Sequence, residues 1–364
     1  MGVLVYRGVV CTPLYAVWIL SSDLPTKDKD EECHYEHSKG KETMTRFGYT
    51  LYCEGNNPRS LVQQAIMAED AGFDFIVISD HYLPWLTTQT HAGFAWSILG
   101  SIAQATSKIQ LATMVTCPIM RYHPAIIAQA AATMGVLSEG RFVLGLGSGE
   151  RLNEHIVGQG WPSIRVRQKM LTEAIEIIQL LWKGGYQSYD GVYFQLDDAR
   201  IFDLPEKPIE TFIAAGGDRA ARLAAHSSGG VCETEPSEGI IKTFVDAGGD
   251  KAKTWGQVIL SWDKDEATAL QTAYDQFRFA AGGWKVQAEL PSPINFDAAT
   301  KNVRPNDLTE SIPSGPDPGQ HTQAIEKFIK SGVCNLAVAY PGTDHEGFME
   351  FWRQQLAPDL VSRK

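Results

Sequence analysis

The sequence predicts an α/β fold in which eight parallel strands alternate with helices and close into a (β/α)8 TIM barrel with insertions. From Arg46 onward, short runs of β-branched and apolar residues alternate with segments of helical period. The alternation supplies eight strands over residues 44–364, a length that suits one barrel. An open doubly wound sheet is the alternative, but the Gly-rich dinucleotide fingerprint that would favour it is absent.

The first half of the barrel segment contains four strand–helix units. Leu61, Val62 and Ile66 lie on one face of the first predicted helix, and Gly72 follows as a typical C-cap. The predicted strands cover residues 46–53, 73–81, 109–118 and 141–150, and the helices cover 58–71, 92–106, 124–138 and 166–183.

The second half repeats the pattern around two insertions. Its predicted strands cover 208–217, 229–234, 256–263 and 334–342, and its helices cover 218–227, 237–247, 265–280 and 319–331. Residues 186–205 alternate in the β manner around the turn dipeptide Asp190-Gly191, which predicts a hairpin. Residues 282–313 are rich in proline and carry Trp284 and Lys285, so we expect a long irregular loop that forms a lid or a substrate wall.

Composition excludes several classes of protein. Hydrophobic residues make up 44% of the 364-residue chain and charged residues 21%, which excludes disorder over most of its length. The net charge of −11 provides no positive field for a nucleic-acid backbone, so no nucleic-acid partner is expected. The six scattered cysteines form no CxxC pair and predict a reducing, cytoplasmic location. No metal-ligand spacing is apparent, so we expect no metal.

Residues 1–43 differ from the rest of the chain. Their apolar run is interrupted by Thr12 and Pro13 and is too short to span a bilayer, so we expect no membrane segment. The stretch 23–42 is densely charged, and Met44 opens directly on a strand pattern. We therefore predict that 1–43 is a disordered or non-native extension and that 44–364 is the barrel domain.

Polar residues at the carboxyl ends of the predicted strands are the candidates for chemistry, because the active sites of such barrels form there. His81 ends the second strand and Glu150 ends the fourth, so we predict an acid/base pair facing one ligand. Trp85 follows His81 and is a candidate wall of the pocket. Hydrogen bonding of His81 to a neighbour and helix capping by Glu150 are the alternative interpretations.

Glycine-rich turns indicate where a flat or anionic ligand can approach the backbone. Residues 144–150 lack the Lys-Ser/Thr pair of a phosphate-binding loop, which excludes a nucleoside triphosphate site of that type. Gly216 and Gly217 open a helix with Arg219 in its first turn and are candidates for contacting an anion. No GxSxG elbow is present and Cys117 lacks an activating partner in the sequence, so covalent nucleophilic catalysis is not indicated.

The segments 78–85, 115–134, 140–162 and 213–217 resemble the luciferase-like flavin and deazaflavin barrels. The motifs DHYLPW and GSGERLNE are most similar to the branch related to F420-dependent glucose-6-phosphate dehydrogenase. The resemblance implies an oxidoreductase that transfers hydride between coenzyme F420 and a small substrate. His81 and Glu150 would be the acid/base groups, one at the substrate hydroxyl and the other at the cofactor's ring nitrogen, and these two roles could be exchanged. It also implies a homodimer and a cis peptide bond at Met114–Val115.

The same resemblance assigns residues to the cofactor and the substrate. Trp85 would lie beside the catalytic pair, and Thr234 matches a substrate-contacting threonine. The implied cofactor contacts are Asp80, Met114, Val115, Cys117, Ser148, Gly149, Asn153, Gly216, Gly217 and Arg219.

The chain departs from the family at the positions that would bind a sugar phosphate. Residues 234–238 read TEPSE and contain no lysine, and the place of an expected arginine falls near Thr309-Glu310-Ser311. Because Glu235 or Glu310 would repel a phosphate dianion, glucose 6-phosphate is not the expected substrate unless another cation substitutes. The candidate substitutes are Lys285, Lys301 and Arg304.

We therefore interpret the chain as an F420-dependent oxidoreductase, with a dehydrogenase acting on an alcohol as the favoured activity. An FMN-dependent monooxygenase or reductase on the same barrel is the first alternative. A non-catalytic flavin-binding barrel is the second, and the intact pair of His81 and Glu150 argues against it.

Overall fold

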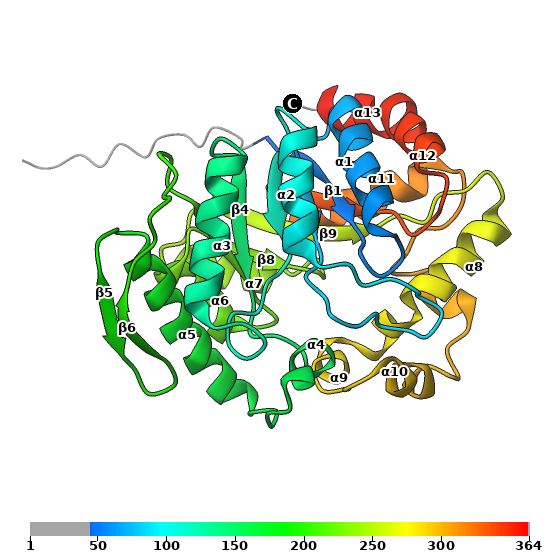
Figure 1. Ribbon diagram of the computed structural model, residues 1–364. Helices are drawn as coiled ribbons and strands as arrows, with labels where there is room; N and C mark the ends of the chain where they lie inside the picture. The colour runs from blue at the N-terminus through cyan, green and yellow to red at the C-terminus, as the bar shows by residue number, and fades with distance from the viewer. Residues whose placement is uncertain (1–43, 363–364) are drawn as a thin grey trace, which may run out of the picture. The chain divides into compact units, whose positions relative to one another are not determined.

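The computed structural model describes residues 44–362, so the predicted extension 1–43 lies outside the described residues. Eight parallel strands form a closed barrel in the order β1-β10-β9-β8-β7-β4-β3-β2, and helices surround it (Figure 1). The predicted fold class is confirmed. None of the helices in 44–362 combines the length and apolar character that a bilayer crossing requires.

The predicted barrel elements are all present, with strands shorter than predicted. The barrel strands are β1 (Arg46–Leu51), β2 (Phe75–Ile78), β3 (Gln110–Thr113), β4 (Phe142–Leu146), β7 (Glu210–Ala214), β8 (Gly230–Glu233), β9 (Thr254–Ile259) and β10 (Asn335–Ala339). The predicted helices are α1 (Pro58–Asp70), α2 (Ala95–Ala105), α3 (Pro124–Leu137), α5 (Ile164–Leu181), α6 (Asp218–Ser227), α7 (Glu238–Asp246), α8 (Glu266–Phe277) and α11 (Pro318–Ser331).

Aromatic side chains fill the barrel interior. Phe212 stacks on Trp255 with ring centroids 4.6 Å apart, and Phe75 meets the same indole edge-on at 5.0 Å. Gly145 is required beside them, because a Cβ there would lie 2.0 Å from the carbonyl oxygen of Thr113. The interior is thus a packed core, and ligands are confined to the mouth of the barrel.

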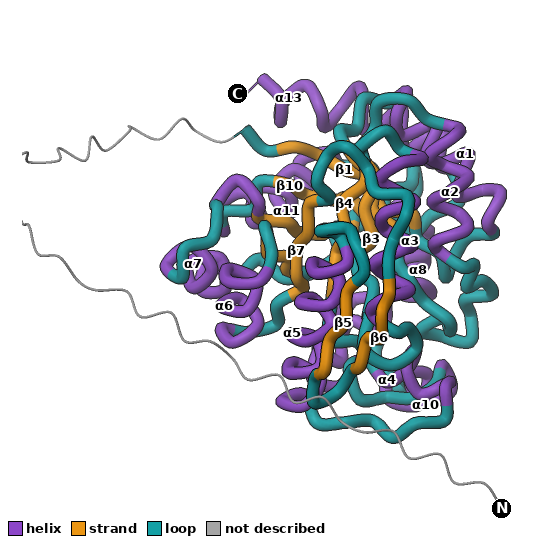
Figure 2. The backbone as a smooth tube through the Cα atoms, turned by 60° about the vertical axis from the view of Figure 1, so that its left-hand side comes forward, coloured by secondary structure: helices purple, strands orange, loops and turns teal. Residues whose placement is uncertain are grey.

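The predicted hairpin over 186–205 is present as β5 (Gln187–Asp190) and β6 (Gln195–Ala199). It lies outside the barrel beside α5 (Figure 2). The Glu173 carboxylate of α5 accepts hydrogen bonds from the backbone N–H groups of Val192 and Tyr193 at 3.0 and 2.8 Å, which anchors the hairpin on that helix.

The second insertion differs from its prediction. The sequence indicates an irregular loop over 282–313, but the structure forms α9 (Trp284–Gln287), α10 (Pro293–Ala299) and a 3-10 turn at Pro305–Leu308. These helices are too short to show a clear apolar period, and Pro293 and Pro305 occupy first turns rather than breaking helices. The segment lies beside α4 (Arg151–Glu154), where the Arg151 N–H donates to the Ala288 carbonyl (Figure 1).

Two C-terminal helices, α12 (His345–Phe351) and α13 (Ala357–Ser362), were not predicted. His345 ties α12 to the barrel: its Nδ1 lies 3.0 Å from the Tyr49 hydroxyl, and its Nε2 lies 3.0 Å from Gln64 Nε2 and 3.2 Å from Asn56 Oδ1. Burial lowers the pKa of His345 to about 4.

This pKa predicts a loss of stability in acid. Between pH 6.5 and pH 4, His345 is protonated in the unfolded chain but neutral in the folded chain. The free energy of unfolding therefore falls as the pH falls. Between pH 7.5 and pH 5, we expect the free energy of unfolding of His345→Gln to fall by about 2 kcal/mol less than that of the wild type, as measured by urea unfolding. His155→Gln, outside this cluster, is the control, and equal losses in wild type and His345→Gln would contradict the assignment.

Candidate active site

His81 and Glu54 meet where β1 and β2 end. Parallel pairing sets Leu51 opposite Ile78, so residues three positions further along both strands arrive at the same level of the mouth. His81 Nδ1 lies 2.6 Å from Glu54 Oε1, and the Glu54 side chain is fully buried. Neither atom has another hydrogen-bond partner among residues 44–362, while Ser79 Oγ donates to the second Glu54 oxygen at 2.9 Å. Glu54 therefore fixes the orientation of the imidazole.

Glu150 faces the other nitrogen of His81. Its Oε1 lies 3.5 Å from His81 Nε2, and both side chains keep a small exposed fraction, 14% and 12%. Asn153 Nδ2 donates to the same Glu150 oxygen at 2.5 Å, and Asn153 Oδ1 accepts from the backbone N–H groups of Tyr82 and Leu83. The structure thus brings the predicted acid/base pair together, and Asn153 links its two strand ends.

The carboxylates decide the charge state of His81. Burial alone would lower the pKa of the imidazole, but Glu54 and then Glu150 favour the protonated ring more strongly, while Arg121 opposes them. The net result is a pKa raised above the ordinary histidine value. A raised pKa favours the protonated ring, which can act as a proton donor.

Asp80 is fully occupied by hydrogen bonds within the protein. Its Oδ2 accepts from Trp96 Nε1 at 3.2 Å and Thr116 Oγ1 at 2.8 Å. Its Oδ1 accepts from Arg121 at 3.2 Å and from the Tyr122 hydroxyl at 3.0 Å. In this arrangement the carboxylate anchors the backbone that carries His81, and a cofactor contact through Asp80 stays a prediction.

Glu54, Arg121 and Glu154 belong to the site but were missed from the sequence. Arg121 bonds the Asp80 carbonyl at 2.6 Å, and its backbone N–H donates to Glu154 Oε2 at 2.8 Å. Burial raises the pKa of Glu154 to about 7 despite the opposing charge of Arg121. Glu54 had a signal, since it follows the first predicted strand directly. Arg121 and Glu154 lie in the segments 115–134 and 140–162 that carry the family resemblance, but neither directly follows a predicted strand.

Trp85 lies against the His81 imidazole. The indole meets the His81 ring edge-on at 5.0 Å and stacks on Phe279 at 4.6 Å with an interplanar angle of 8°. Phe296 contacts it edge-on at 5.2 Å. The 282–313 insertion, together with Phe279 just before it, therefore forms an aromatic wall on the His81 side of the mouth.

Met114 and Val115 form an apolar floor below the mouth. Both are partly buried against the barrel core, and the bond between them is cis, as predicted. Beside them, Gly149 has φ +74° and a Cβ on it would lie 2.5 Å from Cys117 Sγ, so only glycine fits this close approach. Burial raises the pKa of the Cys117 thiol, which keeps it neutral. The floor and the side-chain-free turn suit the face of a flat ring.

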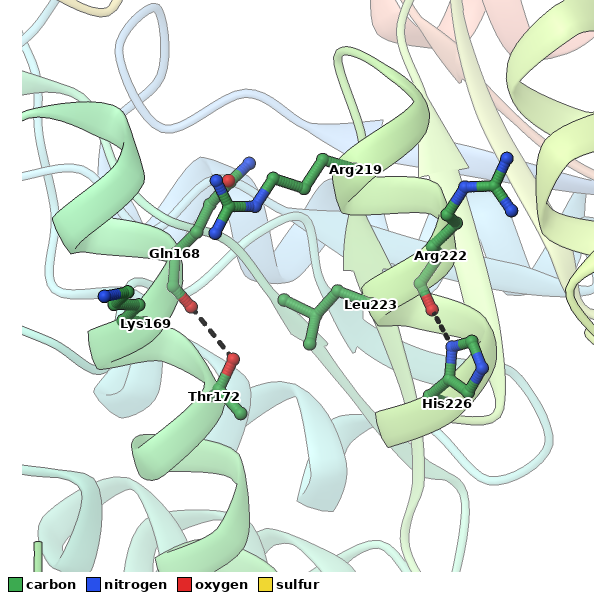
Figure 3. A pocket seen from close by; sticks show the side chains of 7 residues that line it. All are labelled: Gln168, Lys169, Thr172, Arg219, Arg222, Leu223 and His226. Atoms are coloured by element: carbon green, nitrogen blue, oxygen red, sulfur yellow. Dashed lines mark hydrogen bonds between the residues drawn. The ribbon is translucent and has the colours of Figure 1, made fainter.

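The remaining predicted residues lie around the same mouth. Ser148 follows β4, Gly216 and Gly217 join β7 to α6, and Thr234 is exposed directly after β8. Arg219 lines a groove of about 260 Å³ between α5 and α6, with Lys169 and Arg222 nearby (Figure 3). Contacts of these residues with cofactor or substrate stay predictions. No group of His, Cys, Asp and Glu in the described part of the chain is arranged to hold a metal.

Residues 38–334 match the family described as luciferase-like monooxygenase. The chain belongs to this family. A relative from Beutenbergia cavernae, F420-dependent glucose-6-phosphate dehydrogenase, is 33% identical over 88% of this chain and 99% of its own. A second F420-dependent glucose-6-phosphate dehydrogenase, from Segniliparus rotundus, is 34% identical over 87% of this chain and 98% of its own. The two alignments thus extend over nearly the whole length of both relatives.

Solved structures agree with this luciferase-like assignment. An F420-dependent secondary alcohol dehydrogenase in complex with an F420-acetone adduct aligns with a TM-score of 0.81 and 27% identity, over 87% of this chain and 99% of that one. The F420-dependent tetrahydromethanopterin reductase of Methanopyrus kandleri aligns with a TM-score of 0.69 at 23% identity, over 87% and 99%, which shows the shared fold.

Proposed function

We propose that this chain catalyses F420-dependent hydride transfer at an alcohol or carbonyl carbon. The two relatives described above, at 33% and 34% identity, are F420-dependent dehydrogenases, and this chain is an F420-dependent oxidoreductase of the luciferase-like family. The observation that carries the proposal for alcohols is the His81 imidazole, which Glu54 holds at one nitrogen so that the other faces Glu150 at the mouth of the barrel.

The residues present fit a deazaflavin. When bound, F420 supplies a hydride acceptor or donor carbon in a planar ring. Met114 and Val115 would support the face of that ring, and Ser148 and Gly149 offer backbone close to it. Gly216, Gly217 and Arg219 would hold the phosphate side, where the N–H groups of a helix start favour an anion.

Proton transfer falls to this chain's own side chains. As the substrate carbon loses hydride, His81 Nε2 takes the hydroxyl proton, and Glu54 stabilises the imidazolium that forms. Glu150 lies 3.5 Å from the same nitrogen and can share or pass on that proton. In the reverse direction, protonated His81 donates to the carbonyl oxygen.

The alternatives receive less support. The matched structures of FMN-type enzymes, such as the riboflavin lyase with modified FMN at 13% identity, show the fold alone. A barrel that only binds flavin would not need a buried carboxylate on His81 Nδ1 and a second carboxylate facing Nε2.

A binding and turnover experiment tests the proposal. Tryptophan fluorescence is titrated with F420 and with FMN, and F420 reduction is then followed with a panel of alcohols and sugar phosphates. We expect quenching by F420 at micromolar levels, weaker quenching by FMN and reduction by at least one alcohol. Selective FMN binding, or F420 binding without turnover on the whole panel, would contradict the proposal. A homodimer also stays a prediction, which size-exclusion chromatography with light scattering checks.

A further inference from the structure

A basic groove lies between α5 and α6, where Arg219 reaches from α6 towards α5 (Figure 3). The groove is lined by Lys169 of α5, by Arg219, Arg222 and His226 of α6, and by the apolar side chain of Leu223. The four basic residues are all exposed. The whole chain carries a net charge of −11, so the permanent cations beside this groove oppose its overall charge. The groove is therefore a local site of attraction for anions.

The cations of the groove have no partner within the described part of the chain. None of Lys169, Arg219 and Arg222 forms an ion pair or a side-chain hydrogen bond with residues 44–362. The two carboxylates nearest to them in sequence are engaged elsewhere: Glu173 bonds the turn of the β5–β6 hairpin, and Asp218 accepts from a hydroxyl of α7. Because like charges one helical turn apart repel each other, an anion in the groove would relieve the repulsion between Arg219 and Arg222.

The groove begins at the turn that the proposed function assigns to the cofactor phosphate. Gly216 and Gly217 join β7 to α6, and no side chain caps the start of this helix. Arg219 lies in the first turn of α6, and Arg222 and His226 follow about one and two turns further along the same helix. At a rise of 1.5 Å per residue, the basic lining extends for about 10 Å along the helix. An anionic chain that leaves the phosphate can therefore continue along a basic path.

We infer that this groove binds the acidic chain that F420 carries beyond its phosphate. The inference rests on the proposed function and extends the cofactor site to Lys169 and Arg222. The acidic chain of F420 consists of glutamates in γ linkage, each of which keeps a free carboxylate. Lys169 would supply a point charge to one carboxylate, and the guanidinium fork of Arg222 can bond both oxygens of another.

The glutamate content of the cofactor is the variable that tests the inference. The Kd is measured by quenching of tryptophan fluorescence with F420 and with its glutamate-free form, which keeps the phosphate. At about 50 mM salt, we expect the wild type to bind F420 about fivefold more tightly than the glutamate-free form, because exposed ion pairs contribute modestly each. At about 500 mM salt this difference should disappear, because the charges are exposed and are screened.

A double variant tests whether the groove is the site. Lys169→Gln/Arg222→Gln removes two of its cations and leaves the start of α6 and Arg219 unchanged. This variant should bind F420 and the glutamate-free form with the same Kd, and its Kd for the glutamate-free form should match that of the wild type. Lys108→Gln/Arg353→Gln is the matched control, because both residues are exposed and lie outside the groove. The control should keep the fivefold preference, and thermal melting verifies that both double variants fold.

The outcomes separate this inference from the proposed function. Equal Kd values for the two cofactor forms in the wild type, or the same loss of F420 affinity in both double variants, would overturn the inference, while F420 turnover would uphold the proposed function. The expected glutamate dependence without F420 reduction by any alcohol or sugar phosphate would overturn the proposed function and support the groove. If the wild type bound neither form, both would be overturned.

Discussion

Replacing His81 with asparagine should lower kcat for F420 reduction roughly 10³-fold and leave F420 affinity nearly unchanged. Asparagine can still accept or donate a hydrogen bond beside Glu54, so the strand end keeps its support, but it has no group that can take up and release the proton. The loss corresponds to general acid–base catalysis, which contributes about 10²–10⁴-fold. Turnover comes from stopped-flow or steady-state assays and affinity from fluorescence quenching.

His155→Asn is the matched control, because the His155 imidazole bonds the Arg151 carbonyl four residues earlier and is not paired with Glu54 or Glu150. It should retain wild-type kcat. If His81→Asn keeps turnover within threefold of the wild type, His81 is not the proton-transfer group. If F420 affinity falls as much as kcat does, the ring serves mainly to bind.

The strand ends explain why most of the site could be predicted from the sequence. His81 and Glu150 each follow an apolar strand, and barrel closure brings the ends of such strands to one mouth. Their 3.5 Å approach could not be predicted, because it depends on the Asn153 amide, which bonds Glu150 and the backbone after His81. Sequence position indicated the residues, while side-chain bonding decides their geometry.

Glu54 shows the limit of that reasoning. It follows a predicted strand as His81 does, but the register that sets β1 against β2 is needed to see that the two side chains meet. Asp80 is a second case: the resemblance implies a cofactor contact, which stays a prediction, while the structure shows four donors from α2 and from the loop between β3 and α3 on its oxygens. Such convergence of distant segments leaves no local signal in the chain.

Removal of the Glu54 charge should shift the pH dependence of catalysis toward acid. Glu54 is the main group that raises the pKa of His81, so Glu54→Gln should lower that pKa. Alcohol oxidation needs neutral His81, so kcat/KM rises with pH through this pKa. In the variant this rise should occur at lower pH, while kcat at the plateau falls roughly 100-fold because the imidazolium loses its counter-charge.

Glu233→Gln is the matched control for this shift. Glu233 is also a buried carboxylate at a strand end, and burial raises its pKa to about 7, but its partners are Ser237 and Ser331 rather than His81. Its variant should leave the pH profile of kcat/KM in place. A Glu54→Gln profile that coincides with the wild type would show that His81 does not set the profile. A fall in kcat with no shift in pH would reduce Glu54 to a packing role, because only its charge, and not its shape, links it to the protonation of the imidazole.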